Sequence, residues 1–392
     1  MREMDFTEKN LFNRLCGVNN IWRQIRGEVH RHVKYRLERA MVAEVSSRIG
    51  CGRYQRSEHR RGYRNGRYTR SLLTSYGWIE SISVPRVREG GYRPGCFERY
   101  RRRSRLVDRV LLEAFLLGCA TRKTRRVCQG AFGSDISPQA ISNLVHELDD
   151  EVRSFSQRRL LDRYRFLYLD GLWLTFRRPR KIRKVLLVAL GVKADGSCSV
   201  VHFQLARSES AACWWGFVGD MKERGLSGRS LKVIVTDGAA GLLTALDAHY
   251  PWVPRQRCVF HKVMDMKPLL VKTGRSSRLI ADAFRIFEAA TVTEAGKRLS
   301  QFSQRWGRSE PRAVRSLHRD FADCLTYLAY DDPVRTRLKT NNPIERYLQE
   351  IERRTVPMRS FTTVPSAQRI IYGIIAYVLN QNQDMPMTKF TQ

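Results

Sequence analysis

The second half of the sequence predicts an α/β fold, and three observations support it. Three adjacent strand candidates, RFLYLDGLWLTF, KVLLVALGVKADGS and CSVVHFQLA, are joined by short turns. They are followed by a helix over 211–224, the strand LKVIVTDG, a helix over 239–249 and the strand-like RQRCVF. Residues 262–338 then show amphipathic helical patterning with few strand signals. Three hairpin-linked strands followed by helix, strand, helix and strand is the element order of a ribonuclease-H-like fold, here with a helical insertion.

The first 50 residues carry apolar positions at helical spacing, which predicts a helical N-terminal module. These positions are Leu11, Leu15, Val18, Trp22, Ile25, Val29, Val33, Leu37, Met41 and Val45.

Residues 51–160 form the next predicted segment, a basic region that is mostly helical. Residues 51–130 hold 20 Lys plus Arg against 6 Asp plus Glu, which is the footprint of a polyanion-binding surface. Within it, Asn65-Gly66 is a strong hairpin signal and predicts a small β element. The helical patterns over 121–131 and from Ser137 onward predict a helix-turn-helix, although a plain helical hairpin fits them equally well.

The remaining residues complete the predicted domains. We expect the ribonuclease-H-like core to comprise 161–261 and 339–380, with 262–338 as the insertion between its two parts. The second part contains a helix that begins after Asn342-Pro343, because Pro is well tolerated in a first helical turn.

The composition points to a polyanionic partner. The chain has 392 residues and a formal net charge of +33, which argues against an ordinary metabolic enzyme. Nucleic acid is the first candidate, since neutralising phosphates releases counterions, and a membrane surface is the weaker alternative. Arginine supplies 57 of the 71 cations. Its planar fork suits phosphate, although a GC-rich genome would give the same bias.

The sequence contains no run of 18 apolar residues, and the N-terminal MREMDFTEKN is charged where a signal peptide would be apolar. We therefore expect a cytoplasmic, nucleoid-associated protein that does not engage membranes. The nine cysteines are widely spread and include no CxxC pair, so neither disulfides nor a zinc ribbon is expected.

Three acids stand at positions where chemistry is expected. Asp170 ends the apolar run FLYLD, Asp237 ends the strand IVTD, and Glu345 lies in the first turn of the helix after Pro343. Strand ends are where α/β proteins place their sites, although each Asp before Gly could equally be a turn residue. Carboxylates that converge repel one another, and a divalent cation removes that conflict. Hard oxygen ligands favour Mg²⁺ or Mn²⁺, which support phosphodiester cleavage and strand transfer.

Cys258 and His261 follow the strand after Asp237 in RQRCVFHKV. A CxxH pair is half of a zinc site, but no second pair lies at finger spacing, so packing or hydrogen bonding is at least as good an interpretation. His261 could instead orient a phosphate or a nucleophile. Neither a P-loop nor GxGxxG is present, so nucleotide hydrolysis has no support.

Taken together, these motifs resemble the Mutator-type family of bacterial insertion-sequence transposases. The resemblance rests on YLDGLWL, VTDGAAGLLTAL, RQRCVFH and TNNPIERYLQEIERRT, on the upstream stretch RSEHRRGYRNGRYTRSLLTSYGWIESISVPRVR, and on LGCATRKTRR and ISPQAISNLV. It covers roughly residues 50 to 375. It implies a DDE transposase that cuts at terminal inverted repeats, with Asp170, Asp237 and Glu345 as catalytic, metal-binding acids. The family's Cys-x-x-His signature corresponds to Cys258 and His261, as supporting active-site residues.

Contacts to double-stranded DNA, at the terminal repeats and at the target, are expected mainly from the N-terminal half. Arginines that contact phosphates set the position of the protein along the DNA. Polar residues of a helix inserted into the major groove read the bases. The candidates are Arg60, Arg61, Arg64, Arg67, Arg101, Arg102, Arg103, Arg125, Arg126, Gln139, Ser142 and Asn143, together with Arg353 and Arg354 after Glu345.

Two rival functions stay open at this stage. One is a non-catalytic DNA-binding regulator derived from a transposase, and the other is a hydrolytic nuclease with the same core. The presence of all three acids weighs against the first, and the basic segment weighs against the second. Because two element ends must meet, we expect at least a homodimer on DNA.

Overall fold

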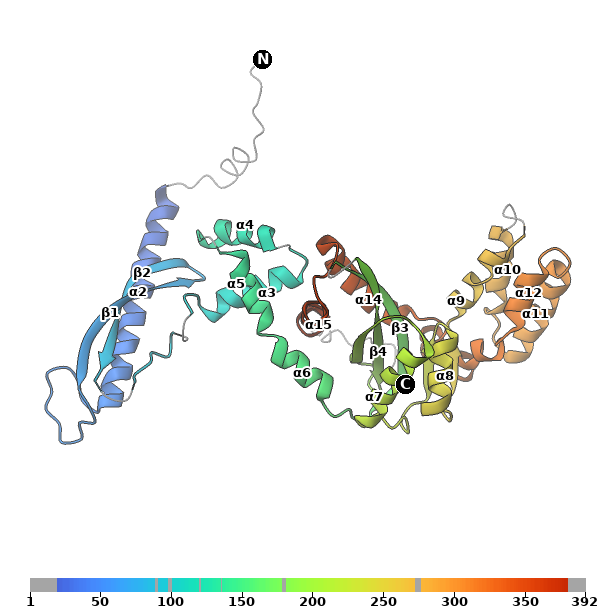
Figure 1. Ribbon diagram of the computed structural model, residues 1–392, viewed down its shortest axis with the longest axis horizontal. Helices are drawn as coiled ribbons and strands as arrows, with labels where there is room; N and C mark the ends of the chain where they lie inside the picture. Colours follow the sequence, from blue (N-terminus) through green and yellow to red (C-terminus); the bar gives the residue numbers. More distant parts are fainter. Residues whose placement is uncertain are drawn as a thin grey trace, which may run out of the picture. The chain divides into compact units, whose positions relative to one another are not determined.

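The computed structural model describes residues 20–88, 91–97, 101–119, 121–134, 136–177, 181–271 and 276–379. The chain divides into two compact units. The first unit comprises residues 1–115 and 119–144, and the second comprises 116–118 and 145–392. Figure 1 shows the elements of both, and each unit is described separately below.

The first unit packs one long helix against a two-stranded sheet. Helix α2 (Asn20–Ile49) lies against the antiparallel strands β1 (Arg64–Thr74) and β2 (Gly77–Val87). Met41 of the helix is fully buried against a small apolar cluster that includes Leu72, Ile79 and Ile82. The helical prediction for the first 50 residues is thus confirmed from residue 20 onward. Its positions Leu11, Leu15 and Val18 lie outside the described residues.

The prediction of a hairpin turn at Asn65-Gly66 is wrong. Gly66 has φ +66° and lies inside β1, where the register to β2 shifts between Arg64 and Arg67. A bulge uses the positive φ of glycine as readily as a turn does. The turn lies at Ser75-Tyr76, where Gly77 has φ +107° and the Thr74 hydroxyl donates to the Gly77 carbonyl over 3.0 Å.

Short helices follow the hairpin. They are α3 (Arg105–Leu116), α4 (Thr121–Phe132), α5 (Pro138–His146) and, in the second unit, α6 (Asp149–Gln157). Helices α4 and α5 are the pair that the sequence predicted as a helix-turn-helix. The continuous pattern from Ser137 onward is divided, because α5 ends at His146 and α6 begins at Asp149.

The second unit is built on a five-stranded mixed sheet with the order β5-β4-β3-β6-β7. The strands are β3 (Tyr164–Phe176), β4 (Ile182–Lys193), β5 (Cys198–Ala206), β6 (Val233–Thr236) and β7 (Arg255–Arg257). Strands β3, β4 and β5 pair antiparallel, whereas β6 pairs parallel to β3 and β7 parallel to β6. The strands predicted from the sequence are therefore confirmed, and the fold is mixed α/β.

Helices α7 (Ala211–Glu223) and α8 (Ala240–His249) pack on one face of this sheet. Leu167 and Leu169 of β3 belong to the same buried cluster as Phe217 of α7 and Leu246 of α8. Side chains alternate along a strand, so Tyr168 and Asp170 lie on the opposite face. The Tyr168 hydroxyl donates there to the Arg337 carbonyl over 3.2 Å.

The described residues between β7 and residue 341 form helices. These are α9 (Val259–Met264), α10 (Ser276–Ile286), α11 (Val292–Trp306), α12 (Pro311–His318) and α13 (Val334–Leu338), with short 3-10 turns at Lys267–Leu269, Ala322–Cys324 and Thr326–Ala329. Helices α10, α11 and α12 lie side by side (Figure 1). This confirms the helical character predicted for 262–338 in its described parts, 262–271 and 276–338.

The chain then returns to the sheet. Helix α14 (Asn342–Thr355) packs against β3, and after a 3-10 turn (Val356–Met358) come α15 (Val364–Gly373) and a π-helical turn (Ile374–Leu379). The predicted helix after Asn342-Pro343 is confirmed. Across the described residues, none of the helices has the length and apolar character needed to cross a membrane.

Candidate active site and nucleic-acid interface

Asp170 lies in the middle of β3 with its side chain half-buried. The Gly171 N–H donates to its Oδ1 over 2.8 Å. The pKa of Asp170 is raised from 3.8 to about 7. Burial is the main cause, the hydrogen bond from Gly171 opposes it, and the carboxylates of Asp237, Glu345 and Glu209 raise the pKa further. In these surroundings the charged form of the carboxyl group is destabilised unless a cation compensates it.

Asp237 follows the last residue of β6. The parallel register pairs Tyr168 of β3 with Val235 of β6, so two residues further along each chain Asp237 comes level with Asp170. The next residue, Gly238, has φ +88°, and a Cβ there would lie 2.2 Å from Nε of Arg257. Only glycine therefore fits beside Asp237. The Asp237 Oδ1 accepts from the Ala239 N–H over 2.9 Å where α8 begins.

Arg257 of β7 fixes the backbone at this point. Its Nε donates to the Asp237 carbonyl over 3.3 Å. Its other two nitrogens form ion pairs with Asp265 at 2.7 Å and with Asp320 at 3.0 Å, and only 13% of its side chain is exposed. The loop that carries Asp237 is thus joined to the segments after α9 and α12. Arg257 carries no local sequence signal for this role, because its partners lie at distant positions in the chain.

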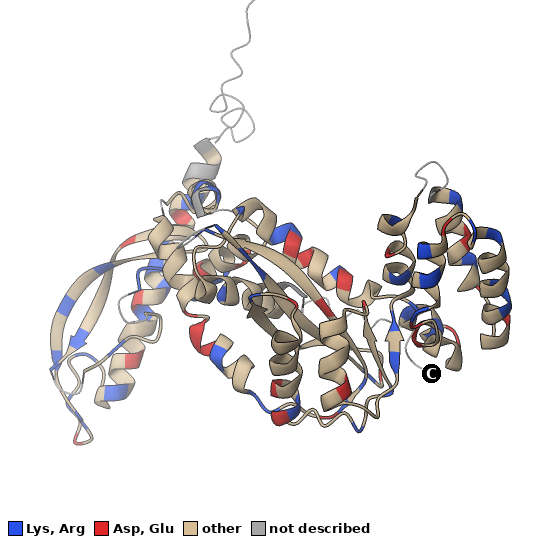
Figure 2. Ribbon diagram, turned by 45° about the vertical axis from the view of Figure 1, so that its right-hand side comes forward, with Lys and Arg blue, Asp and Glu red and all other residues tan. Residues whose placement is uncertain are grey.

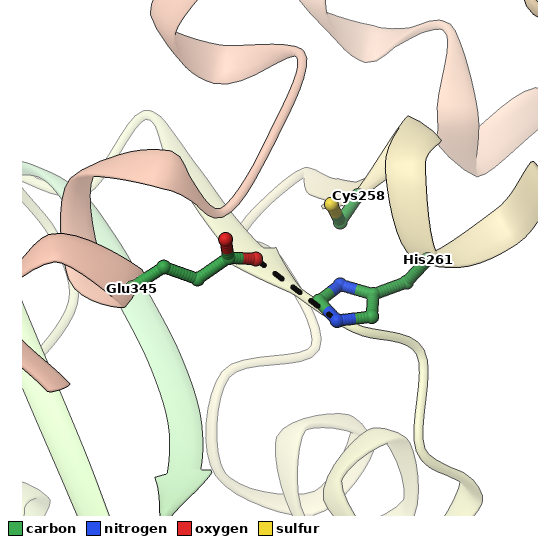
Figure 3. A group of neighbouring side chains, drawn as sticks. All are labelled: Cys258, His261 and Glu345. Atoms are coloured by element: carbon green, nitrogen blue, oxygen red, sulfur yellow. Dashed lines mark ion pairs between the residues drawn. The ribbon is translucent and has the colours of Figure 1, made fainter. Parts of the chain in front are cut away.

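Glu345 lies in the first turn of α14, and its N–H donates to the Asn341 carbonyl over 3.0 Å. Its Oε1 lies 4.0 Å from Nε2 of His261. Figure 3 shows the Glu345 carboxylate directed toward the His261 ring. Glu345 also acts on the pKa of Asp170, so the structure brings the three predicted acids together from β3, the end of β6 and the start of α14.

His261 and Cys258 lie beside Glu345 at the start of α9. One side-chain ligand atom from each of the three residues lies within 4.8 Å of the other two. The pKa of His261 is raised to about 8, mainly by its interaction with the Cys258 side chain and also by the charges of Glu345 and Asp237, while burial opposes the shift. Cys258 is fully buried. The predicted supporting pair therefore contacts the acid cluster through His261.

Glu209 is a fourth acid at the site that sequence reasoning missed. It lies between β5 and α7, and a Cβ built on Gly171 would be 3.0 Å from its Oε1. Its pKa is raised by burial and by Asp237, and a hydrogen bond with the Trp173 side chain opposes the shift. The signal was an acid directly after a predicted strand, in the polar run RSES.

The predicted DNA contacts of the first unit divide into two groups. Figure 2 shows basic residues recurring along the β1–β2 hairpin, and all of those in its two strands are arginines. Several candidates there and in the following helices are exposed, namely Arg60, Arg61, Arg67, Arg102, Arg125, Arg126, Gln139 and Asn143. Ser142 is half-buried, and the Gln139 amide donates to Asn143 over 2.9 Å on the same face of α5.

The other group is half-buried, and its guanidinium groups bond to residues of the first unit. The guanidinium of Arg64 donates to the carbonyls of Gly52 and Cys51 and to the Ser46 hydroxyl, over 3.2, 2.9 and 2.9 Å. Arg101 and Arg103 both pair with Asp108, whose side chain is only 7% exposed. These arginines therefore join parts of the first unit to one another.

Arg353 and Arg354 of α14 differ in the same way. Both pair with Glu350, but 77% of the Arg353 side chain is exposed against 12% of that of Arg354. Gly118 packs close to the backbone of Arg354, since a Cβ on Gly118 would lie 3.6 Å from the Arg354 Cα. Of the two, Arg353 is the one that can reach a ligand in solvent.

Comparison with known proteins assigns the family. The model for the family "Transposase, Mutator family" matches residues 8–384. The chain belongs to this family. The resemblance seen in the sequence is thereby confirmed over nearly the whole chain.

Curated relatives of this Mutator-family chain are transposases of insertion sequences. The transposase for element IS1201 of Lactobacillus helveticus is 28% identical over 368 residues, which cover 94% of this chain and 97% of the relative. The transposase for IS256 in transposon Tn4001 of Staphylococcus aureus is 30% identical over 333 residues, covering 83% and 84%. A transposase function for this chain is therefore supported.

A solved structure, the Drosophila P element transposase strand transfer complex, aligns with a TM-score of 0.38 at 10% identity, covering 74% of this chain and 94% of that chain. Such a low similarity carries no further conclusion about this protein.

Proposed function

We propose that this Mutator-family transposase binds the terminal inverted repeats of its element and catalyses metal-dependent DNA cleavage and strand transfer with Asp170, Asp237 and Glu345. The observation that carries the proposal is the convergence of these acids from three distant segments. Asp237 is level with Asp170 in the parallel register, and both Asp237 and Glu345 act on the pKa of Asp170.

The sheet supports a ribonuclease-H-like core for this chemistry. Three antiparallel strands continue into two parallel strands in the order β5-β4-β3-β6-β7, with Asp170 on the central strand. We assign 161–261 and 339–380 to this core and 262–338 to a helical insertion that precedes Glu345. Residues 51–160 would form the DNA-binding region, and 1–50 a helical module.

The donor set fits a hard divalent cation such as Mg²⁺ or Mn²⁺. Carboxylate oxygens are the ligands that these ions prefer. The pKa of Asp170 is raised mainly by burial and further by the neighbouring carboxylates, and a bound cation would favour the charged form against both effects. When bound, the metal would activate the nucleophile and stabilise the leaving 3′ oxygen. Asp170, Asp237 and Glu345 would hold it.

The chain's own residues then have distinct roles. Asp170 presents its carboxylate from β3 and Asp237 from the loop that follows β6, whose backbone is fixed by Arg257 and Gly238. His261, with a pKa of about 8, carries a proton at neutral pH and offsets part of the charge of Glu345.

DNA binding would rest on the exposed cations of the first unit and on Arg353. Most of these arginines contact phosphates, and Gln139, Ser142 and Asn143 of α5 would read bases in the major groove. With about 6–10 phosphate contacts, affinity should fall roughly 10³–10⁵-fold between about 50 and 200 mM salt. Two ends of the element must be joined, so the active form on DNA is a homodimer or a larger oligomer. The protein would act in the cytoplasm, in association with the nucleoid.

The test is cleavage and strand transfer on labelled DNA that carries the inverted repeats flanking the element. Wild type, Asp237→Asn and Glu345→Gln are compared in Mg²⁺ and in EDTA, and binding is measured in parallel. We expect Mg²⁺-dependent products at the repeat ends that fall by at least about 10³-fold in both variants, with binding retained.

Two other results would contradict the proposal. Binding of the repeats without cleavage in any divalent metal would indicate a DNA-binding regulator. Cleavage without preference for the repeat ends would indicate a hydrolytic nuclease.

A further inference from the structure

Cys258 forms a hydrogen-bonded connection between two segments that carry proposed catalytic acids. It is fully buried at the point where β7 ends and α9 begins. Its N–H donates over 2.8 Å to the carbonyl of Thr236, the residue before Asp237. Its Sγ accepts over 3.3 Å from the N–H of Asn341, the residue before α14.

The connection continues into the first turn of α14. The Asn341 carbonyl accepts from the N–H of Glu345 over 3.0 Å. A parallel bond runs from the Val259 N–H to the Lys339 carbonyl over 3.0 Å. Two bonds thus hold the start of α9 against residues 339–341, and one of them depends on a side chain.

The bond to sulfur is the part of this connection that a substitution can remove. Asn341 is fully buried, and its N–H would have no partner at this position if the Cys258 side chain lost its acceptor. A buried donor without a partner is costly, so the start of α14 would shift to find one. Glu345 would move with it, because its N–H is bonded to the same residue.

We infer that Cys258 is a positioning residue, whose sulfur sets the place of Glu345 relative to Asp237 by accepting the Asn341 N–H. The inference rests on the proposed function, in which these two acids hold the metal. In this role Cys258 connects β6 to α14 through hydrogen bonds. His261, in contrast, lies next to the Glu345 side chain itself, with its Nε2 4.0 Å from Oε1.

The test compares Cys258→Ala, which removes the acceptor, with Cys258→Ser, which restores an oxygen acceptor. Cys324→Ala is the matched control, because Cys324 is also fully buried near β7 but its thiol donates to the Asp320 carbonyl, away from α14. The readouts are the melting temperature, the affinity for repeat DNA, the cleavage rate at saturating DNA, and the affinity for Mn²⁺ measured without DNA.

We expect Cys258→Ala to cleave on the order of 10²-fold more slowly, the size of effect that an ångström-scale misplacement produces. Its Mn²⁺ affinity should fall and its DNA affinity should stay the same. Cys258→Ser should recover part of both losses, and Cys324→Ala should match wild type in both. If Cys258→Ala does not fold, Cys258→Val, which fills the buried space but has no acceptor, takes its place with the same expected losses of rate and Mn²⁺ affinity.

Cleavage and Mn²⁺ affinity in Cys258→Ala, or in Cys258→Val in its place, equal to those of Cys324→Ala would overturn the inference while leaving the proposed function intact, provided wild type cleaves and Glu345→Gln does not. A wild type that neither cleaves nor binds Mn²⁺ would overturn both. A thiolate-to-metal charge-transfer band on titration with Co²⁺, absent in Cys258→Ala, would instead make Cys258 a metal ligand and overturn its positioning role.

Discussion

The two units of this transposase place their charged side chains by different means. In the second unit, strand register brings Asp170 and Asp237 level, and buried elements hold both. In the first unit, exposed and half-buried arginines alternate along one short stretch, as Arg67 and Arg64 do on β1. A site built on a buried sheet can therefore be predicted from acids that follow apolar strand residues. A surface built from cations depends on which of them are already occupied by protein acceptors.

Removing the charge of Asp170 tests whether the acids of the second unit are held together on a buried sheet. Of the substitutions considered, it has the largest expected effect on the free energy of unfolding. Because the folded-state pKa of about 7 exceeds the ordinary 3.8, the folded form binds the proton more tightly. Stability contributed by this group is lost as pH rises from about 4 to 7 and stays constant above that. Asp170→Asn keeps the acceptor for Gly171 and should be more stable than wild type above pH 7, by a few kcal/mol at most.

The measurement is chemical denaturation from pH 4 to 8 in EDTA. Adding Mg²⁺ at pH 8 should stabilise wild type and leave Asp170→Asn nearly unchanged. If the free energy of unfolding of the two proteins depends on pH in the same way, the charge of Asp170 does not destabilise the fold. The contrast between the two units would then be weaker.

Arg64→Ala tests whether an arginine of the first unit serves the fold rather than DNA binding. The guanidinium donates three hydrogen bonds between the hairpin and the end of α2. We expect a loss of roughly 2 kcal/mol in folding free energy, since bonds from a charged donor are stronger than average but this side chain is only half-buried. Thermal denaturation measures it. A variant as stable as wild type with weakened DNA binding would reverse the assignment of Arg64.

Arg67→Ala, three residues along the same strand, is the matched opposite and has the smallest expected effect. Its side chain is exposed and donates to the Ser83 hydroxyl over 3.3 Å. Stability should change by less than about 0.5 kcal/mol. The slope of log affinity for DNA against log salt should become shallower by about one if Arg67 contacts a phosphate. An unchanged slope would remove Arg67 from the DNA-contact surface.

Much of the second unit was predictable from the sequence because its signals are local. The apolar runs predicted the strands, and an Asp between an apolar run and a Gly marked both aspartates, although Asp170 lies within β3 and only Asp237 follows a strand end. Glu209 was missed because its position depends on tertiary packing. A Cβ on Gly241 of α8 would lie 3.0 Å from the Glu209 carbonyl, so the approach of α8 to the loop before α7 places this acid.

The first unit was less predictable for a physical reason. Asn65-Gly66 fits a turn by itself, but its glycine serves a bulge, and the turn formed where the Thr74 hydroxyl could bond the Gly77 carbonyl. Likewise, nothing in the local sequence distinguishes Arg101 and Arg103, which pair with Asp108, from the exposed Arg102. Charge density is visible in a sequence, whereas the use of each charge is decided by distant partners.

Mn²⁺ binding tests the central claim most directly, because it asks whether the three acids form one cation site. Free Mn²⁺ is titrated by electron paramagnetic resonance into wild type, Asp170→Asn, Asp237→Asn and Glu345→Gln, with Asp195→Asn as the control for an exposed acid in the turn between β4 and β5. We predict a marked loss of Mn²⁺ affinity in each of the three variants and none in the control. Wild-type affinity in all four variants would contradict a shared site.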